Sequence, residues 1–598
     1  MSLDLTIGSL CRAYRSGALK PTALVESLIQ ERNRQRARHI WISEVDDAGL
    51  RARARELEAQ APESLPLYGI PFAIKDNIDF AGLPTTAACP AFAYQPERSA
   101  PVVQALIDAG AIALGKTNLD QFATGLVGTR SPYGICGNAF DPAFIAGGSS
   151  SGSAVAVALG LASFSLGTDT AGSGRVPAAF NNLVGYKPTL GTVSIRGVVP
   201  ACRSLDVVSL FALTAEDVLR VREVVAKFDP ADAAARQPGM APRAGFGHAP
   251  SFRFAVPSPA QREFFGNAEY AQLFDASIDR LRALGGEALE VDITPLLAAA
   301  RLLYEGPWVA ERYLATESLI TQPGAMLEVT RRIIEAGAAP RATDCFRAQY
   351  RLKELIREAR PIWASAAVLL LPTAGTHFRI AEIEAEPIAL NSRLGTYTNF
   401  VNLMDLAAVA VPAGFTSARL PFGVSLIAPA WSDPDLLALA GRMQRAAVNT
   451  LGATSLPLPP ADPTHEAPAG FVDVMVCGAH MSGLPLNKQL LERGAWQVAA
   501  TRTAPIYRFY ALPGGPPFRP GLVQVGDSGV AIDVEVWRMP IEHFGSFVAG
   551  IPAPLGIGKV KLADGSLVSG FLCESLCVAG ATDISALGGW RQYLRDKA

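Results

Sequence analysis

The sequence predicts an α/β fold followed by a smaller, mostly β region, and three observations support this prediction. After a helical start, segments of helical periodicity alternate with apolar, strand-like segments from about residue 67 to about residue 440. A stretch with five prolines then interrupts the pattern at residues 456–470. The total length of 598 residues also exceeds that of one ordinary domain. We therefore expect domains at residues 1–455 and 471–598, joined by a proline-rich linker at 456–470.

The first sixty residues have a helical pattern, and the α/β alternation follows them. Pro21 stands in the first turn of an expected helix, where its missing N–H costs no hydrogen bond. The run LYGIPFAIKDNID, residues 67–79, predicts a buried strand that ends in charged residues. Residues 101–123 predict a helix, a strand at 111–114 and a second helix. A small-residue helix then begins at residue 151 and leads into the strand SFSLGTD, and a second alternating stretch spans about 250–440.

The last part of the chain predicts a small α+β domain dominated by strands. The run FVDVMVCGAH opens it as a strand, and GLVQVGDSGVAIDVEVWRM and GIGKVKLADGSLVSGFLC continue the pattern. Asp564 and Gly565 predict a hairpin turn inside the last of these segments.

The charge balance and the cysteine pattern indicate which binding partners, metals and disulfides to expect. The chain has 53 basic and 55 acidic residues, and this balance predicts neither a nucleic-acid nor a membrane partner. The eight cysteines are scattered and form no paired CxxC motifs, so we expect no structural metal and no disulfide framework. The first residues lack the basic leader and apolar core of a signal peptide, which favours a cytoplasmic location.

A dense cluster of hydroxyls and glycines is the main candidate site. GGSSSGSAVAVALG, residues 147–160, is followed by GTDTAGSGR, residues 167–175. Glycines at a helix start could hold a phosphate, but the P-loop spacing and its lysine are absent. Residues 148–152 also fit GxSxG around Ser150, although a nucleophile elbow needs a histidine, and His248 and His377 are isolated. A lysine that burial makes neutral could instead activate a serine, and Lys75 ends an apolar strand.

Three motifs in order, GIPFAIKDN, GGSSSGS and GTDTAGSGRVPAAFNNLVGYKPT, resemble the amidase signature family over residues 5–455. They supply Lys75, Ser149 and Ser173 at spacings of 74 and 24 residues. The resemblance implies a mixed central sheet flanked by helices, no cofactor and no metal. It also implies a Ser-Ser-Lys mechanism, in which Ser173 is the nucleophile, Ser149 relays the proton and Lys75 is the base. The backbone N–H groups of Thr170, Ala171, Gly172 and Ser173 would then form the oxyanion hole.

Other segments resemble the allophanate hydrolases more specifically. Ala171 replaces the glycine of most amidases, and LLYEGPWVAERY and the tail VCGAHMSGLPLNKQLLERG fit this group. The resemblance implies hydrolysis of allophanate to ammonia and carbon dioxide in urea degradation, with N-carboxycarbamate as the first product and urea carboxylase as the functional partner. Arg312 would bind the substrate carboxylate and Tyr304 would contact the substrate, with Gly125 and Asp405 as weaker matches. The competing interpretation of Arg312 is a surface ion pair with Glu311 or Glu317.

The C-terminal region resembles the gamma-glutamyl cyclotransferase-like domains. In some allophanate hydrolases this domain is thought to decarboxylate the first product, and His480 and Glu535 are the candidates here. The alternative is a purely structural domain, and we expect a homodimer. Two other functions stay open for the whole chain: a general small-amide amidase of the malonamate or indoleacetamide type, and the glutamine-amidase subunit of a tRNA-dependent amidotransferase.

Overall fold

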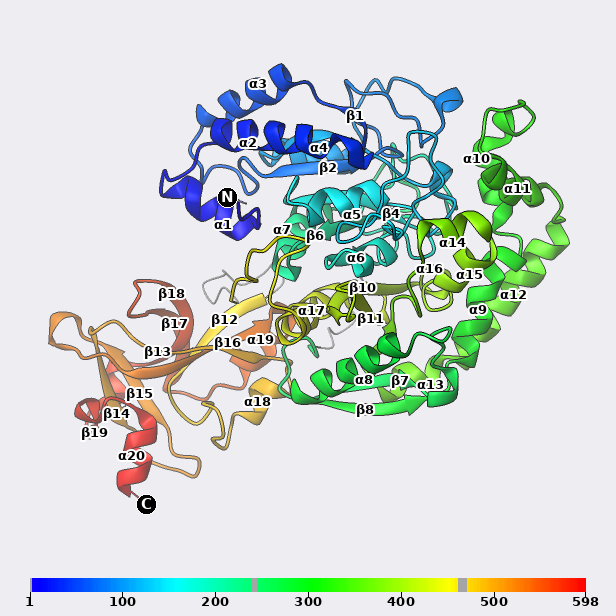
Figure 1. Ribbon diagram of the computed structural model, residues 1–598. Coiled ribbons are helices and arrows are strands. Elements are labelled where there is room, and N and C mark those ends of the chain that lie inside the picture. The colour runs from blue at the N-terminus through cyan, green and yellow to red at the C-terminus, as the bar shows by residue number, and fades with distance from the viewer. Residues whose placement is uncertain (1–2, 238–244, 461–470, 598) are drawn as a thin grey trace. The chain divides into compact units, whose positions relative to one another are not determined.

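The computed structural model describes residues 3–237, 245–460 and 471–597, and the chain forms two compact units (Figure 1). The first unit comprises Met1–Gly239 and Ser251–Pro459, and the second comprises Met240–Pro250 and Pro460–Ala598. Most of the expected linker, residues 461–470, lies outside the described residues. The domain boundaries expected from the sequence remain a proposal.

One mixed sheet forms the centre of the first unit. In its described residues the sheet has eleven strands, ordered β1 (Trp41–Glu44), β3 (Ile112–Thr117), β2 (Pro71–Lys75), β4 (Phe164–Asp169), β6 (Val207–Ala212), β5 (Val184–Lys187), β10 (Leu406–Phe415), β11 (Pro421–Pro429), β9 (Val368–Pro372), β7 (Phe252–Pro257) and β8 (Gly286–Val291). Figure 1 shows these strands running from β2 near the top of the unit to β7 and β8 at its base.

The direction of three neighbouring strands determines where the site forms. β2 is parallel to β3 and β4, whereas β6 pairs with β4 in the antiparallel sense. Every residue of β2 and β4 is buried, as expected for central strands that are covered on both faces. Because parallel strands end at the same edge of a sheet, Lys75 at the end of β2 and Asp169 at the end of β4 lie at one edge.

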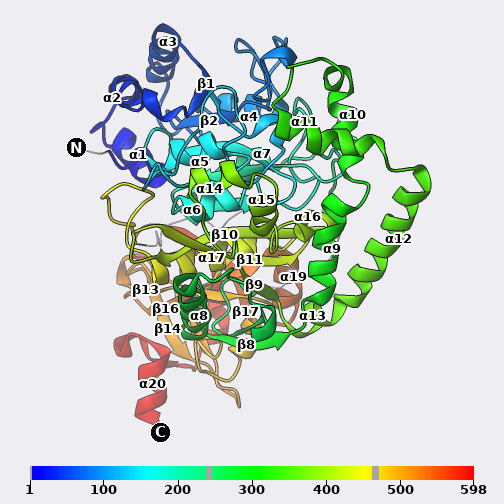
Figure 2. The ribbon, with the colours of Figure 1, turned by 45° about the vertical axis from the view of Figure 1, so that its right-hand side comes forward.

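Helices surround the sheet of the first unit. They are α1 (Ile7–Arg15), α2 (Pro21–Arg34), α3 (Asp47–Glu58), α4 (Pro101–Asp108), α5 (Ser151–Ala158), α6 (Val176–Phe180), α7 (Ala215–Val225), α8 (Ala268–Ala283), α9 (Thr294–Glu305), α10 (Val309–Ile320), α11 (Glu328–Glu335), α12 (Ala342–Glu358), α13 (Arg360–Ser365), α14 (Ile380–Ala385), α15 (Ala389–Leu394), α16 (Phe400–Leu403) and α17 (Asp433–Ala447). Helices α9 and α12 pack together, and with α10 and α11 they form a helical lobe on one side of the unit (Figure 2).

The expected elements are confirmed with two exceptions. The first sixty residues are not purely helical, because β1 lies among them and pairs with β3. Pro21 is the first residue of α2, and α5 begins at Ser151. The second helix expected within residues 101–123 is wrong, because Gln121–Ala123 forms only a short 3-10 turn in which Phe122 has φ 51°. The neighbouring Asp120 carboxylate accepts the N–H groups of Val127, Gly128 and Arg130, and these bonds hold the chain in a loop.

The second unit is mostly β in its described residues. One sheet is ordered β13 (Trp496–Arg502), β16 (Asp533–Pro540), β12 (Phe471–Val476), β18 (Leu567–Cys573) and β17 (Leu555–Lys561). The other is ordered β15 (Pro520–Gln524), β14 (Tyr507–Ala511) and β19 (Thr582–Asp583). Its helices are α18 (Lys488–Leu491), α19 (Ile541–Ala549) and α20 (Trp590–Lys597).

Two local features of the second unit involve residues that the sequence analysis discussed. The hairpin of β17 and β18 turns at Asp564 and Gly565, as expected. Residues 245–250 belong to this unit as well, and among them the His248 ring stacks on Trp496 at a centroid distance of 3.8 Å. No described helix in either unit combines the length and the apolar character that crossing a membrane requires.

A glycine contact next to the sheet edge gives a test of the fold. A methyl group at Gly185 of β5 would overlap the Gly174 carbonyl, directly after Ser173, and the Ala178 methyl group. We expect Gly185→Ala to destabilise the protein by about 1–3 kcal/mol or more, because backbone cannot move aside as a flexible side chain can. Thermal unfolding measures this effect. Gly545→Ala in α19, which has open space around it, is the matched control and should leave Tm unchanged or higher.

Candidate active site

Lys75 is a buried amine at the end of β2. Its Nζ donates to Ser149 Oγ at 2.8 Å and to Thr168 Oγ1 at 2.7 Å. Burial lowers the pKa of Lys75 to about 7, although the nearby carboxylates of Asp120, Asp206 and Asp169 act in the opposite direction. A substantial fraction of this lysine is therefore neutral near pH 7, so it can accept a proton.

Ser149 lies in the tight loop before α5. The peptide bond between Gly148 and Ser149 is cis, and Gly147 has φ 75°. The Ser149 carbonyl accepts the N–H of Asp120 at 3.0 Å. A methyl group at Gly148 would overlap the Asp120 carboxylate, so glycine is the residue that allows this close approach. The loop thereby presents the Ser149 hydroxyl to Lys75.

Ser173 lies in the loop between β4 and α6, and Asp169 organises this loop. The Asp169 carboxylate accepts the N–H groups of Gly172 at 2.9 Å and Gly174 at 3.0 Å. It also forms a two-point ion pair with Arg175, in which both N–O distances are 2.9 Å. Ser173 is 3% exposed. The loop is therefore fixed by a buried charge pair beside the serine.

The backbone N–H groups of this loop divide into two classes. That of Gly172 donates to Asp169, so an oxyanion role for Gly172 would require this bond to break. Within the described chain, the N–H groups of Thr170, Ala171 and Ser173 have no acceptor. Three of the four predicted donors are thus available to a bound oxygen.

Three residues close to these groups were not predicted from the sequence. Thr168 accepts from Lys75, Asn402 donates to the Asp169 carbonyl at 2.8 Å, and Asp206 accepts the Thr170 hydroxyl. Thr168 could have been found, because it stands in the third motif two residues before Thr170. Asn402 and Asp206 lie outside the motifs, and only the fold brings them to the loop.

Arg312 is buried on α10, with 3% exposure. Its Nη1 donates to the Ala123 carbonyl at 3.2 Å and to Thr124 Oγ1 at 3.1 Å. Burial acts to lower the pKa of Arg312, but the influence of Tyr304, Cys202, Asp206 and Glu311 keeps it above the ordinary value. Glu311 instead accepts the backbone N–H of Ser204 at 2.9 Å. In the described ranges Arg312 forms no ion pair, so the surface-pair interpretation is wrong.

Tyr304 lies close to both Arg312 and the serine loop. The Arg312 guanidinium is 5.9 Å from the centre of the Tyr304 ring. The same ring packs against a buried cluster that contains Ala171, Cys202 and Leu303. The structure therefore brings Tyr304 and Arg312 together and places Tyr304 beside the loop that carries Ser173.

The two weaker predicted residues have different surroundings. Gly125, with φ 152°, follows Thr124 and so stands next to the loop that Arg312 contacts. A side chain there would overlap the Asp120 carboxylate. Asp405 forms an ion pair with Arg236 at 2.7 Å, and none of its described hydrogen bonds reaches Arg312. Roles in substrate binding remain predictions for both residues.

The two histidines considered for a serine-histidine site lie elsewhere. His377 stacks on Phe180 at 3.9 Å, its Nε2 bonds to the Ile145 carbonyl, and burial lowers its pKa to about 4. His248 stacks on Trp496 in the second unit. Ser150 Oγ donates to the Thr168 carbonyl at 3.3 Å. No histidine contact of Ser150 occurs in the described part of the chain.

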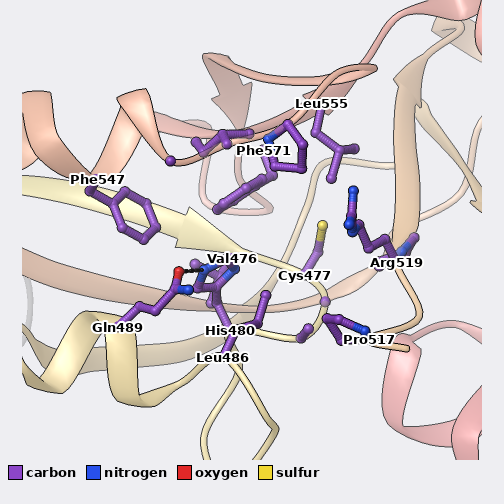
Figure 3. Close-up of a pocket in the computed structure, with 16 residues that line it drawn as sticks. Val476, Cys477, His480, Leu486, Gln489, Pro517, Arg519, Phe547, Leu555 and Phe571 are labelled. Carbon is purple, nitrogen blue, oxygen red and sulfur yellow. Dashed lines mark hydrogen bonds between the residues drawn. The ribbon is translucent and has the colours of Figure 1, made fainter. Parts of the chain in front are cut away.

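The second unit has its own pocket, of about 230 Å³, near His480 (Figure 3). His480 Nε2 bonds to Gln489 Oε1 at 3.0 Å, and the ring lies against Phe547 and Phe571. Arg519 lies across the pocket from this pair (Figure 3). Burial lowers the pKa of His480. The pocket thus combines apolar walls with one cation and one imidazole.

Glu535 does not line this pocket. Its carboxylate accepts the backbone N–H of Ser482 at 2.7 Å and the Trp537 Nε1–H at 3.1 Å, and it pairs with Arg591 at 2.8 Å. These contacts hold the segment that follows His480. Its predicted catalytic role remains untested, and its partners are those of a structural carboxylate.

Comparison with known proteins agrees with this geometry. Residues 23–437 match the Amidase family, and residues 472–595 match the allophanate hydrolase C-terminal domain. Urea amidolyase of Saccharomyces cerevisiae is 44% identical over 589 residues, which is 95% of this chain and 32% of the yeast protein. The chain therefore spans about a third of the length of the curated relatives it matches first.

Relatives of similar length also exist. A solved structure of Kluyveromyces lactis allophanate hydrolase is 41% identical, with a TM-score of 0.80, over 98% of this chain and 99% of that chain. A glutamyl-tRNA(Gln) amidotransferase subunit of Deinococcus radiodurans is 36% identical over 77% of this chain and 100% of its own length. These matches confirm the mixed-sheet amidase signature fold and the separate, mostly β C-terminal region. The chain belongs to the amidase family and carries a match to the C-terminal domain of allophanate hydrolases.

Proposed function

We propose that this chain hydrolyses allophanate, urea-1-carboxylate, by a Ser-Ser-Lys mechanism. The observation that carries the proposal is the buried Arg312, which has no carboxylate partner in the described chain and lies beside Tyr304 near the serine loop. A buried cation of this kind favours a substrate with its own carboxylate. The match to allophanate hydrolases over nearly the whole chain supports the same substrate.

In the first half-reaction Ser173 Oγ attacks the carbonyl carbon of the terminal amide. Its proton passes through Ser149 to neutral Lys75, along the hydrogen bond between these two residues. The protonated lysine then returns the proton through Ser149 to the leaving nitrogen. The carbon–nitrogen bond breaks, ammonia leaves, and the acyl group stays on Ser173 as an ester.

The negative oxygen of the tetrahedral intermediate would be received by backbone N–H groups. Those of Thr170, Ala171 and Ser173 have no acceptor within the described chain, and they lie in a loop that Asp169 and Arg175 hold rigid. Donors that are already oriented need no reorganisation when charge develops, and losing one typically costs about 10²–10³ in rate.

In the second half-reaction water replaces ammonia. Lys75, through Ser149, removes a proton from water, the hydroxyl attacks the ester carbon, and Ser173 recovers its proton. The product is N-carboxycarbamate, which retains the carboxylate that Arg312 would bind. Loss of carbon dioxide from this product gives carbamate and finally a second ammonia and carbon dioxide.

The His480 pocket is the candidate site for that loss of carbon dioxide. Its volume of about 230 Å³ and the presence of Arg519 suit a small anion. The contrasting proposal is that the C-terminal unit only assembles subunits, as expected of a homodimer. A functional link to urea carboxylase is part of the same proposal, because the matched relatives are named urea amidolyases and extend well beyond the part that this chain matches. We place the enzyme in the cytoplasm on its scattered, unpaired cysteines.

A steady-state screen with the purified chain separates the candidate functions. We expect ammonia release from allophanate and little from glutamine, malonamate or indoleacetamide. Preference for glutamine would instead support the amidotransferase function, whose representative matches 77% of the chain. Preference for an uncharged amide would support a general amidase and would contradict the role of Arg312.

The first prediction concerns the serine–lysine chemistry. Ser173→Ala and Lys75→Ala should abolish ammonia release, and Ser149→Ala should reduce it severely. The base must be neutral, and its pKa is about 7, so kcat/KM should fall about tenfold per unit well below pH 7. A pH–rate profile measures this limb. Near-normal turnover in Lys75→Ala would eliminate the mechanism.

The second prediction concerns recognition of the carboxylate. Arg312→Lys keeps the charge but loses the planar fork, so KM for allophanate should rise about 10- to 100-fold. Tyr304→Phe should raise KM less. Inhibition by malonate, a dicarboxylate mimic, gives an independent readout. Equal malonate affinity in the parent and Arg312→Lys would show that another group binds the carboxylate.

The third prediction concerns the second unit. If its pocket decarboxylates the first product, His480→Ala in the full chain should release the first ammonia normally, while carbon dioxide release falls to the enzyme-free rate. His543→Ala in α19 is the matched control. Ammonia and carbon dioxide are followed separately. Normal carbon dioxide release in His480→Ala would contradict decarboxylation in this pocket. A dimer measured by light scattering would then support a role of the second unit in assembly.

A further inference from the structure

Asp206 is a buried carboxylate directly before β6, and the proposed mechanism does not use it. It is 5% exposed. One carboxylate oxygen accepts the N–H of Ala201 at 2.8 Å, and the other accepts the N–H of Cys202 at 3.2 Å. The Thr170 hydroxyl donates to the same carboxylate at 2.5 Å. Asp206 therefore joins a neighbouring turn to the loop that carries Ser173.

Thr170 is held on two sides. The carbonyl of the peptide that precedes it, that of Asp169, accepts Asn402 Nδ2 at 2.8 Å. In a planar trans peptide this carbonyl and the Thr170 N–H point in opposite directions, so the bond to Asn402 fixes the direction of that N–H. Asn402 also donates to the Leu205 carbonyl at 3.0 Å, next to Asp206. The Thr170 hydroxyl bond to Asp206 fixes the side-chain direction.

Asp206 interacts electrostatically with two charged residues of the candidate active site, Arg312 and Lys75. Arg312 on α10 stabilises its ionised form, whereas burial disfavours that form and raises the pKa of Asp206 to about 6. In turn, ionised Asp206 raises the pKa of Lys75, together with Asp120 and Asp169, while Arg312 lowers it. Ionised Asp206 also raises the pKa of the buried Cys202 thiol. Asp206 is thus electrostatically coupled to both the expected base and the expected carboxylate ligand.

We propose that Asp206 is a positioning residue of the amide-hydrolysing site, which holds the Thr170 hydroxyl and so orients the backbone N–H groups that receive the oxyanion. This inference rests on the proposed Ser-Ser-Lys function. Asp206 makes no covalent bond and transfers no proton in the reaction. Its contribution is therefore expected in kcat, because oriented donors matter when charge develops on the substrate oxygen.

Asp206→Asn replaces one of the two acceptor oxygens by an NH2 donor, which faces an N–H or hydroxyl donor in either orientation, and Thr170→Val removes the hydroxyl, so both variants disrupt the same contact. We expect each to lower kcat about 10- to 100-fold, a part of the cost of losing an oxyanion donor. The double variant should lose little more than either single variant, because both delete one interaction. Thr170→Ser keeps the hydroxyl, so its kcat should be higher than that of Thr170→Val, as rescue by a conservative variant. KM should not rise in Asp206→Asn, since removing an anion near Arg312 does not weaken binding of a carboxylate.

The pH profile distinguishes this role from a merely structural one. Asp206→Asn removes an anion that favours the charged form of Lys75, so the acid limb of kcat/KM should move to lower pH by about half a unit or more. Thr170→Val retains the carboxylate, so its limb should move less. Asp217→Asn is the matched control, because Asp217 is another buried carboxylate that accepts a backbone N–H, that of Ile7 at 3.0 Å. This variant should alter Tm without lowering kcat.

Labelling of Ser173 by a small fluorophosphonate provides a readout that does not depend on the amide substrate. The phosphoryl oxygen uses the same N–H groups, so Asp206→Asn and Thr170→Val should slow labelling while Asp217→Asn should not. If the parent chain is labelled but releases no ammonia from allophanate, the proposed substrate is wrong, and the labelling test of the positioning role still applies. Parent-like kcat and labelling in a folded Asp206→Asn protein would overturn the positioning role.

Discussion

The constraint on which the site depends is the burial of one lysine among carboxylates that are already satisfied. Lys75 stays partly neutral because no carboxylate bonds directly to its Nζ in the described chain; hydroxyls of Ser149 and Thr168 do. Asp169 is paired with Arg175, and Asp120 accepts three backbone N–H groups. If either carboxylate bonded to the amine instead, the lysine would be held as a charged ion-pair partner and could not act as a base.

The same carboxylates build the loops around the lysine. Asp169 accepts two N–H groups of the loop that carries Ser173, and Asp120 holds the loop that Arg312 contacts. Each negative charge therefore has a structural role that keeps it away from Lys75. Buried charges of this kind are costly unless fully paired, which explains why each one has several donors. The hydrogen bonds that fix the two loops are therefore the same ones that keep Asp120 and Asp169 from pairing with Lys75.

The sequence motifs predicted the candidate catalytic residues but not the residues that hold their loops in place. Lys75 and Ser149 were predicted, and the structure joins them by a hydrogen bond across 74 residues. Asn402 reaches the Asp169 carbonyl across 233 residues and could not be predicted, because this contact depends on the strand order of the large sheet. The helix expected near residue 121 failed for a related reason, since bonds from Asp120 outweigh local helical preference. Alternation predicted the fold class because it reflects burial, which is a local property.

The loop at residues 120–124 contacts both the proposed carboxylate-binding residue, Arg312, and the loop that carries Ser149. Arg312 comes from the helical lobe of α9–α12, and it contacts Ala123 and Thr124 of that loop. Leu319 and Ile320 of the same lobe pack with Phe122 in one buried cluster. Two residues before Phe122, the Asp120 N–H donates to the Ser149 carbonyl. Residues 120–124 therefore connect the helical lobe that carries Arg312 with the loop that carries Ser149, so a displacement of these residues would alter the surroundings of both side chains.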